Sequence, residues 1–460
     1  MKLPFDSPGA IVILIYFTVV LGIGLFRNKR RFSEDESDYL LAGRKLTIFP
    51  FTASLVATWY GGILGVGEFT FTYGISNWVV FGLPYYIFAL LFAFFVAGKI
   101  RQSESFTIPD RFHQAYGRGP AIISAVLVMI LASPAPYILS VGVLLGFLFD
   151  LPLLPALILA TLLSMIYIYR GGFRSVVRTD VLQFMLMFTG FGALVLFAFS
   201  KYGGFGELTG KLNIMGKSLH LTWHGGNSTQ YIVVWFFIAL WTFVDPGFYQ
   251  RCAAAKSPAI ARRGILISIL FWVAFDFLTL TAGLYSVLLP TGVVTDAKLA
   301  LPLLGMEILP PLLQGLFFAG LLATIMSTVD SLGFISAITF GRDIMARRKE
   351  NSIKWTQIGL VVVGIGSLIM AWAIPSVVDL WLTLGSVVVP GLLLPFLGTF
   401  LPQVKIPKVE WMMIASAGAS IIWFLLGAAD VPFLGVQPFY AGLVVSVIWT
   451  GPGLLKNRGS

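Results

Sequence analysis

The residues with the clearest chemical potential are hydroxyls and a carboxylate inside a long apolar stretch. Residues 320–331 read Gly-Leu-Leu-Ala-Thr-Ile-Met-Ser-Thr-Val-Asp-Ser. At about 3.6 residues per helical turn, one helix face collects the hydroxyls of Thr324, Ser327, Thr328 and Ser331. Asp330 lies at the flank of that face. Several oxygen ligands and one carboxylate at membrane depth suit a hard cation, although such hydroxyls can also bond to their own helix backbone.

Three more acids fall within apolar stretches: Glu68, Asp245 and Asp276. A charged carboxylate without a partner at the centre of a bilayer is unfavourable by about 2.5–3.5 kcal/mol. The pattern places every Lys and Arg in a loop or at a helix end, so no basic side chain is expected beside these acids. Either the acids are protonated or a transported cation supplies the positive charge. For Asp276 we expect a structural hydrogen bond, and Glu68 receives no role.

The composition defines the class of protein. The chain has 460 residues, of which 57% are hydrophobic and 11% are charged, whereas soluble proteins carry about 25% charged residues. We therefore expect an all-α polytopic protein that is embedded in a lipid bilayer. The single cysteine, Cys252, excludes an internal disulfide and disfavours a cysteine-based metal site.

About thirteen apolar segments are long enough to cross a membrane as helices. They lie at 10–26, 47–75, 78–98, 119–148, 152–169, 179–200, 230–250, 264–289, 308–340, 356–375, 378–401, 411–428 and 437–455. If the N-terminus is outside, nearly all Lys and Arg residues fall on the inner side, and the exceptions are Lys2, Lys201, Lys211, Lys217 and Lys298. This distribution follows the positive-inside rule and puts the C-terminus in the cytoplasm. The net charge of +10 therefore reflects topology, and we expect no nucleic-acid partner.

Two of the segments contain helix breakers. Four glycines, each unfavourable in a helix by about 1 kcal/mol, crowd the segment at 47–75: Gly61, Gly62, Gly65 and Gly67. Five segments later, Asp245 is followed by proline and glycine, which interrupt a helix. Because five is odd, the two broken segments run in opposite directions. This is typical of an inverted-repeat transporter whose binding site uses unwound backbone, although breakers can also be packing kinks.

Depth in the membrane relates the first broken segment to the hydroxyl face. Ala57 lies roughly 16 Å from the inner end of its segment, and Thr328 lies roughly 18 Å from the inner end of its own. At equal depth the two segments can share one ion. Its ligands would be the backbone carbonyls of Ala57 and Tyr60 and the hydroxyls of Ser327 and Thr328.

Four further stretches carry a resemblance to a known family. They are Leu-Ala-Gly-Arg-Lys-Leu at 41–46, Gly-Gly-Phe-Arg-Ser-Val-Val-Arg-Thr-Asp-Val-Leu-Gln at 171–183, Tyr-Gln-Arg-Cys-Ala-Ala-Ala-Lys-Ser at 249–257, and Thr-Ile-Met-Ser-Thr-Val-Asp-Ser at 324–331. In this order and spacing they resemble the sodium/solute symporter family, which has the LeuT-type five-plus-five fold. The resemblance implies an extra helix and a basic inner loop at 1–45, a transport core of ten helices at 46–401, and two more helices at 402–460.

The resemblance also implies ion sites. The positions that match the family's main sodium site are Ala57, Tyr60, Thr324, Ser327 and Thr328. Thr324 stands where alanine is usual, but its expected ligand is the backbone carbonyl. The second cation site of some members matches Asp180, Ser327, Asp330 and Ser331. Asp330 in this pattern is similar to the choline-transporter branch, as are Trp59 and the glycines that follow it.

Substrate-binding positions implied by the resemblance are Trp59, Gly61, Trp241, Asp245 and Phe248. The polar pair of sugar-transporting members is Ile63-Leu64 here, which disfavours a sugar. The acid that the proline branch has on this helix is replaced by Trp59, so proline is not assured. The acids and aromatics favour an amine-bearing cation or a zwitterion, with the aromatic rings forming a wall for the amine.

The sequence therefore predicts a secondary active transporter that couples sodium entry to uptake of a small organic solute. We expect a monomeric functional unit in the plasma (inner) membrane, with sodium as coupling ion and no other cofactor. One alternative is proton coupling through Asp330 or Asp180. Another is a sensory or channel-like protein on the same fold, which the short tail after the last segment disfavours. No protease or hydrolase motif is present, so we expect no enzyme activity.

Overall fold

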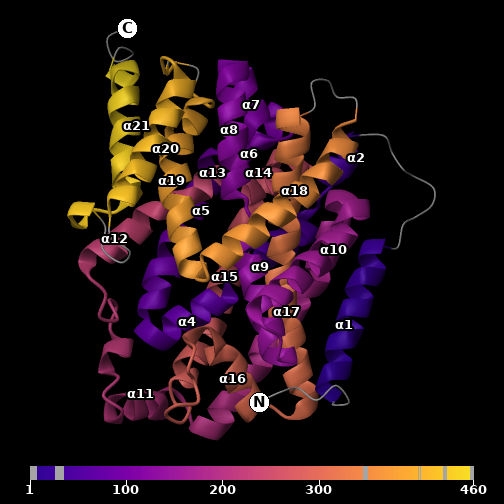
Figure 1. Ribbon diagram of the computed structural model, residues 1–460, viewed down its shortest axis with the longest axis vertical. Helices are drawn as coiled ribbons and strands as arrows, with labels where there is room; N and C mark the ends of the chain where they lie inside the picture. The colour runs from indigo at the N-terminus through magenta and orange to yellow at the C-terminus, as the bar shows by residue number, and fades with distance from the viewer. Residues whose placement is uncertain are drawn as a thin grey trace.

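The computed structural model describes residues 8–25, 36–345, 351–401, 403–404, 406–427 and 433–455. Within these ranges the regular structure is helical and no β-strand forms, apart from one isolated bridge between Leu46 and Ala255. Figure 1 shows the helices packed side by side. A helix pairs its backbone donors and acceptors within one segment, as a bilayer without water requires. The predicted all-α class is confirmed.

The first half of the chain forms ten α-helices and two shorter turns of other helical types. They are α1 (Pro8–Leu25), α2 (Glu36–Leu41), η1 (Ala42–Arg44), α3 (Ile48–Trp59), α4 (Ile63–Tyr73), η2 (Trp78–Gly82), α5 (Leu83–Phe95), α6 (Ala97–Ser103), α7 (Ile108–Tyr116), α8 (Arg118–Leu131), α9 (Ala135–Phe149) and α10 (Leu153–Tyr202). The basic loop predicted after the first helix lies outside the described residues.

The second half continues the same pattern. It forms α11 (Phe205–Ile214), η3 (Ser218–Leu221), α12 (Thr229–Ile238), α13 (Trp241–Val244), α14 (Pro246–Ala254), α15 (Pro258–Ser286), η4 (Ala297–Leu299), α16 (Ala300–Ile308), α17 (Pro311–Ile338), η5 (Thr339–Met345), α18 (Ser352–Ala373), α19 (Val377–Gly398), α20 (Val409–Leu426), η6 (Phe433–Gly435) and α21 (Pro438–Leu455).

Nine helical spans of the described part are long and apolar enough to cross a membrane, and the bent pair α3–α4 makes a tenth. Three shorter apolar helices coincide with the other predicted segments, at Pro8–Ile23, Leu153–Met165 and Pro438–Gly451. The count of about thirteen and the division at residues 45 and 401 stay predictions.

Both predicted helix breaks are present. α3 and α4 meet at a 55° bend around Tyr60, Gly61 and Gly62. In the other broken segment, Asp245 has an extended backbone (φ −65°, ψ 117°) between α13 and α14, with Pro246 opening the new helix. Proline is favourable at that first position because its missing N–H has no helical partner there.

The connection between two predicted segments is tighter than expected. The segments at 152–169 and 179–200 are two helices of α10 that meet at a sharp kink at Gly172 (φ 61°, ψ −170°), where a longer loop was expected. A Cβ at Gly172 would lie 2.8 Å from the backbone oxygen of Tyr39, so only glycine fits this close approach. Asp180 therefore lies about two turns after this kink, inside the second helix of α10.

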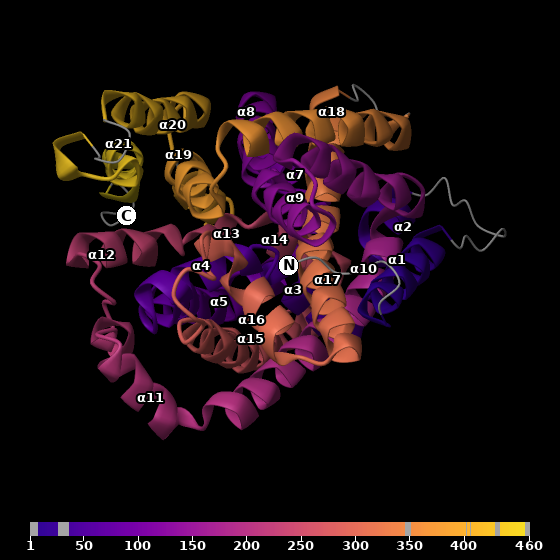
Figure 2. The ribbon, with the colours of Figure 1, turned by 60° about the horizontal axis from the view of Figure 1, so that its bottom comes forward.

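The centre of the molecule is formed by the broken helices and by the long α17. α17 packs along α10, and α3 packs against α10, α15 and α17. Figure 2 shows α1 at one edge and α20 with α21 at the other, outside this centre. The start of α1 and the end of α21 lie at opposite ends of the molecule in Figure 1.

Candidate functional site

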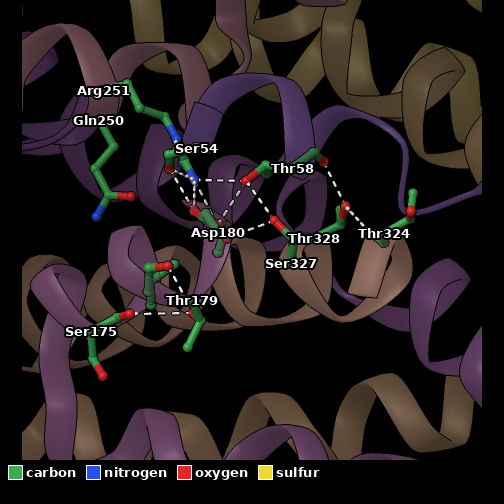
Figure 3. A network of polar contacts seen from close by, with 12 residues as sticks. Ser54, Thr58, Ser175, Thr179, Asp180, Gln250, Arg251, Thr324, Ser327 and Thr328 are labelled. Atoms are coloured by element: carbon green, nitrogen blue, oxygen red, sulfur yellow. Dashed lines mark hydrogen bonds and ion pairs between the residues drawn. The ribbon is translucent and has the colours of Figure 1, made fainter. Parts of the chain in front are cut away.

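Four helices bring a buried polar cluster together at the centre of the bundle (Figure 3). The cluster consists of Ser54 and Thr58 on α3, Asp180 on α10, Arg251 on α14, and Ser327, Thr328 and Ser331 on α17. Each of these side chains is buried. α3 and α10 belong to the first half of the chain, and α14 and α17 belong to the second half. The cluster therefore joins the two halves.

Asp180 is the acceptor at the middle of the cluster. The Ser327 hydroxyl donates to its Oδ1 at 2.6 Å, and the Ser54 hydroxyl donates to its Oδ2 at 2.5 Å. Nη2 of Arg251 lies 3.4 Å from the same Oδ2. Both Asp180 and Arg251 are 0% exposed, so this ion pair is shielded from bulk solvent. Such a pair persists only where hydrogen bonds satisfy the remaining polar atoms.

Arg251 binds the hydroxyls of two further helices. Its guanidinium donates to Ser54 Oγ at 3.0 and 3.1 Å, to Thr58 Oγ1 at 2.7 Å and to Ser331 Oγ at 2.6 Å. Arg251 lies in the last turn of α14, at a helix end as expected, but its side chain is buried in the bundle instead of facing solvent. For Asp180, the compensating positive charge therefore comes from the chain itself.

Thr328 connects α17 to the broken end of α3. Its hydroxyl donates to the backbone carbonyl of Thr58 at 2.6 Å, whereas the Thr324 hydroxyl donates to Gly320 of its own helix at 2.7 Å. Bonding to the local backbone thus explains Thr324, whereas Ser327 donates to Asp180 and Thr328 makes only a longer bond of 3.5 Å to the Thr324 carbonyl of its own helix. The prediction for Thr324 involves its backbone carbonyl, and the hydrogen bond of its hydroxyl to Gly320 does not involve that atom.

The end of α3 offers backbone oxygen atoms next to this hydroxyl face. α3 stops at Trp59, and Ala57 lies in its last turn, where carbonyls lose the donors that a continuing helix would supply. Tyr60 follows, and its carbonyl accepts the Ile63 N–H at 3.0 Å, which leaves one lone pair. A Cβ at Gly61 would lie 2.3 Å from Thr328 Cβ, so glycine is required for α3 and α17 to approach this closely.

Of the four residues of the predicted second cation site, Asp180 is on α10 and the other three lie on different sides of α17. Ser327 and Ser331 face Asp180 and Arg251. Asp330 is buried and interacts electrostatically with Tyr16 of α1, and the Tyr16 hydroxyl also contacts Met326, one turn before Asp330. Asp330 therefore belongs to the side of α17 that packs against α1.

Beside the cluster lies a cavity of about 110 Å³ with an aromatic wall. The aromatic lining residues are Trp59, Tyr60, Phe81, Tyr85, Tyr137, Trp235, Trp241, Phe248 and Trp381. Two acids, Asp245 and Asp276, and the amide of Asn77 supply polar groups. A concave, mostly apolar site with a few placed polar groups is typical of small-molecule binding.

The two cavity acids have partners of a different kind from that of Asp180. Asp245 caps α14 by accepting the Phe248 N–H at 2.8 Å. Asp276 on α15 accepts the Tyr60 hydroxyl at 2.9 Å and also the Tyr86 hydroxyl. In the part of the chain that the structure describes, no Lys or Arg lies within ion-pair distance of either acid, but Arg251 interacts electrostatically with Asp245 at longer range.

Of the predicted substrate-binding residues, Trp59, Trp241, Asp245 and Phe248 line the cavity. Gly61 faces Thr328 and Tyr137 and acts through close packing instead. Asp276 makes the structural hydrogen bonds expected of it, but its place on the cavity wall was not anticipated. Tyr137, Trp381, Ser54 and Thr58 were not anticipated either. Ser54 and Thr58 are four residues apart, a spacing that could have indicated a polar face on α3.

Comparison with known proteins agrees with the geometry. Residues 39–408 match the model of the sodium:solute symporter family. A high-affinity choline transporter of Drosophila melanogaster is 26% identical over 81% of this chain, which spans only 63% of that protein. A sodium/pantothenate symporter of Haemophilus influenzae is 26% identical over 93% of this chain and 92% of its own length. An osmoregulated proline transporter of Bacillus subtilis is 26% identical over 94% and 92%.

Solved structures support the fold independently. The substrate-bound outward-open structure of a Na⁺-coupled sialic acid symporter superposes with a TM-score of 0.80 over 98% of both chains, at 18% sequence identity. A nucleobase-cation-symport-1 family transporter gives 0.59 at 12% identity. This likeness establishes the LeuT-type arrangement predicted for the core. With the family model covering most of its length, the chain belongs to the sodium:solute symporter family.

Proposed function

We propose that the protein is a secondary active transporter that uses sodium entry to carry a small amine-bearing cation or zwitterion into the cell. One observation carries the choice of solute. Asp276 faces an aromatic cavity and accepts hydrogen bonds from two tyrosine hydroxyls, with no basic side chain within ion-pair distance among the described residues; Asp245 on the same wall accepts a backbone N–H and interacts only at longer range with Arg251. An ammonium group would supply the missing charge and would stack against the aromatic wall.

Sodium would bind where the broken end of α3 meets α17. Its ligands are the carbonyls of Ala57, Tyr60 and Thr324 and the hydroxyls of Ser327 and Thr328. Support comes from the Thr328 hydroxyl, which already bridges to the Thr58 carbonyl at 2.6 Å. An ion that replaced this bond between α17 and α3 with several oxygen contacts would hold the two helices together and stabilise the outward-facing state.

A second cation has less room. Asp180, Ser327 and Ser331 are within reach of Arg251, whose guanidinium provides a fixed positive charge between α10 and α17. We therefore propose one coupling sodium. The set Asp180, Ser327, Asp330 and Ser331 would accept a second ion only after Arg251 moved away.

The orientation is proposed from charge. Basic side chains such as Lys99, Arg101 and Arg111 lie on α6 and α7, which share the end of the molecule where α21 finishes (Figure 1). By the positive-inside rule this end faces the cytoplasm and the start of α1 faces outward. A plasma (inner) membrane location and a monomeric functional unit complete the proposal.

A thermal-shift screen tests the function. The single cysteine, Cys252, is buried, so a thiol-reactive fluorophore reports unfolding of the detergent-purified protein. Amines, amino acids, carboxylates and sugars are each added in sodium chloride and in potassium chloride. We expect an amine to raise the unfolding temperature only in sodium. Stabilisation by a sugar or a simple carboxylate would contradict the solute class. Stabilisation that follows pH and ignores sodium would indicate proton coupling instead.

A further inference from the structure

Tyr60 takes part in both proposed binding sites through different atoms. Its backbone lies at the break between α3 and α4, where its carbonyl belongs to the proposed sodium site. Its side chain leaves the break in another direction and reaches α15, where the hydroxyl lies 2.9 Å from Asp276 Oδ1 and 2.9 Å from the Trp272 carbonyl. Asp276 is one of the two acids on the cavity wall.

The Tyr60 side chain is held firmly. It is 3% exposed, and its ring packs against Phe275 with a centroid distance of 4.5 Å. Its backbone, in contrast, sits in the short irregular stretch between two helices, where dihedral angles can change without breaking a helix. A movement of Asp276 is therefore transmitted by the anchored ring to the part of α3 that can respond.

We propose that Tyr60 couples the sodium site to the solute cavity by joining the backbone at the α3–α4 break to the carboxylate of Asp276. The inference rests on the sodium site proposed above. Sodium bound to the Tyr60 carbonyl fixes the break and with it the position of the hydroxyl on Asp276. A cationic group bound at Asp276 fixes the same residue from the other end. Binding of either ligand then restricts part of the motion that binding of the other must also restrict. The second ligand therefore binds more tightly, which is positive cooperativity.

Tyr86 provides a matched control within the same site. Its hydroxyl donates to the other oxygen of Asp276, Oδ2, but it lies on α5 and has no part in the break. Replacing either tyrosine by phenylalanine removes one hydroxyl from the same carboxylate. Only the Tyr60 change also removes the connection to α3.

The experiment uses sodium alone as the probe, so it needs no knowledge of the solute. Sodium chloride is titrated against potassium chloride at constant ionic strength, and intrinsic tryptophan fluorescence or the unfolding temperature gives the midpoint. The proteins are wild type, Tyr60→Phe, Tyr86→Phe, Asp276→Asn, and each tyrosine variant combined with Asp276→Asn. This set forms two double-mutant cycles on the same acid.

We expect Tyr60→Phe to weaken sodium binding about three- to tenfold, the size of one lost hydrogen bond, and Tyr86→Phe to change it less than about twofold. Asp276→Asn should shift the midpoint in wild type and in Tyr86→Phe, but not in Tyr60→Phe. An equal shift by Asp276→Asn in the Tyr60→Phe background would overturn the proposal, because the acid would then act on sodium without Tyr60.

Two further outcomes are separable. If the wild type shows no sodium response while potassium and sodium give the same unfolding temperature, the proposed sodium site fails and the coupling role fails with it. If Asp276→Asn does not purify as a folded protein, the single tyrosine variants decide. Equal effects of Tyr60→Phe and Tyr86→Phe would then refute the coupling role, and a selective effect of Tyr60→Phe would support it.

Discussion

Asp180 and Asp276 are two buried carboxylates in one bundle, yet the protein surrounds them in opposite ways. Asp180 has an arginine and two serine hydroxyls, supplied by three other helices. Asp276 has two tyrosine hydroxyls and a cavity. The positive charge that one acid needs is built into the fold, whereas the other acid leaves that charge to be supplied from outside.

This difference distinguishes an acid with a structural role from an acid with a proposed role in transport. A charge compensated within the chain contributes in every conformation in which the pair persists, so Asp180 and Arg251 serve assembly of the two core halves. An acid whose charge is compensated by a ligand is more stable when the ligand is bound. In the proposed function, Asp276 therefore favours binding of a cation in the cavity. Under the proposed function, two buried acids of the same type therefore have different roles, and the partners of each acid determine which role it has.

The largest effect is expected when the positive charge of Arg251 beside Asp180 is removed. Arg251→Met leaves Asp180 buried and unpaired, which should lower the free energy of unfolding by about 3–5 kcal/mol. Asp180→Asn in the same protein should recover much of this loss, because it removes the orphaned charge. Urea titration of the purified proteins, followed by tryptophan fluorescence, measures both. A single Arg251→Met variant as stable as wild type would show that Asp180 does not depend on this charge.

The ion site gives the next effect. Thr328→Ala removes a hydroxyl that reaches α3 and should weaken sodium binding about tenfold or more. Thr324→Ala is its control, because that hydroxyl bonds within α17 and the carbonyl stays. Sodium dependence of solute uptake into proteoliposomes measures both variants. The assignment fails if Thr328→Ala keeps the wild-type sodium dependence or if the two alanines behave alike.

The acid at the helix break sharpens the comparison further. Asn can replace Asp as the cap of α14, so Asp245→Asn removes charge while keeping the bond to the Phe248 N–H. We expect about tenfold weaker binding of a cationic solute, with little change in unfolding temperature. Isothermal titration with the amine found in the screen is the measurement. A variant that unfolds earlier but binds normally would make Asp245 a structural cap only.

The sequence predicted the helical class, the two breaks and the face of α17 that meets α3, because periodicity, proline and glycine are local signals. It did not anticipate that the Arg251 side chain is buried, since a basic residue near the end of an apolar stretch usually marks a boundary, and only the packing of α14 shows that the side chain turns inward. Asp276 was recognised as an intramembrane acid, but its place on the cavity wall depends on the approach of α3, α5 and α15. No spacing within one segment contains that information.

The smallest effect concerns His220, a buried ionisable group that lies outside the membrane spans in η3. Its Nε2 lies 2.9 Å from the Phe71 carbonyl, and burial lowers the pKa of the imidazole below its ordinary value. The unfolded chain therefore binds a proton more readily than the folded one, and stability declines as the pH falls below about 6.5. Like Asp276, His220 has no opposite charge beside it in the described structure, but here no ligand compensates. His220→Gln should lessen the fall in unfolding temperature between pH 8 and pH 5.5, and an unchanged pH dependence would mean that other groups control it.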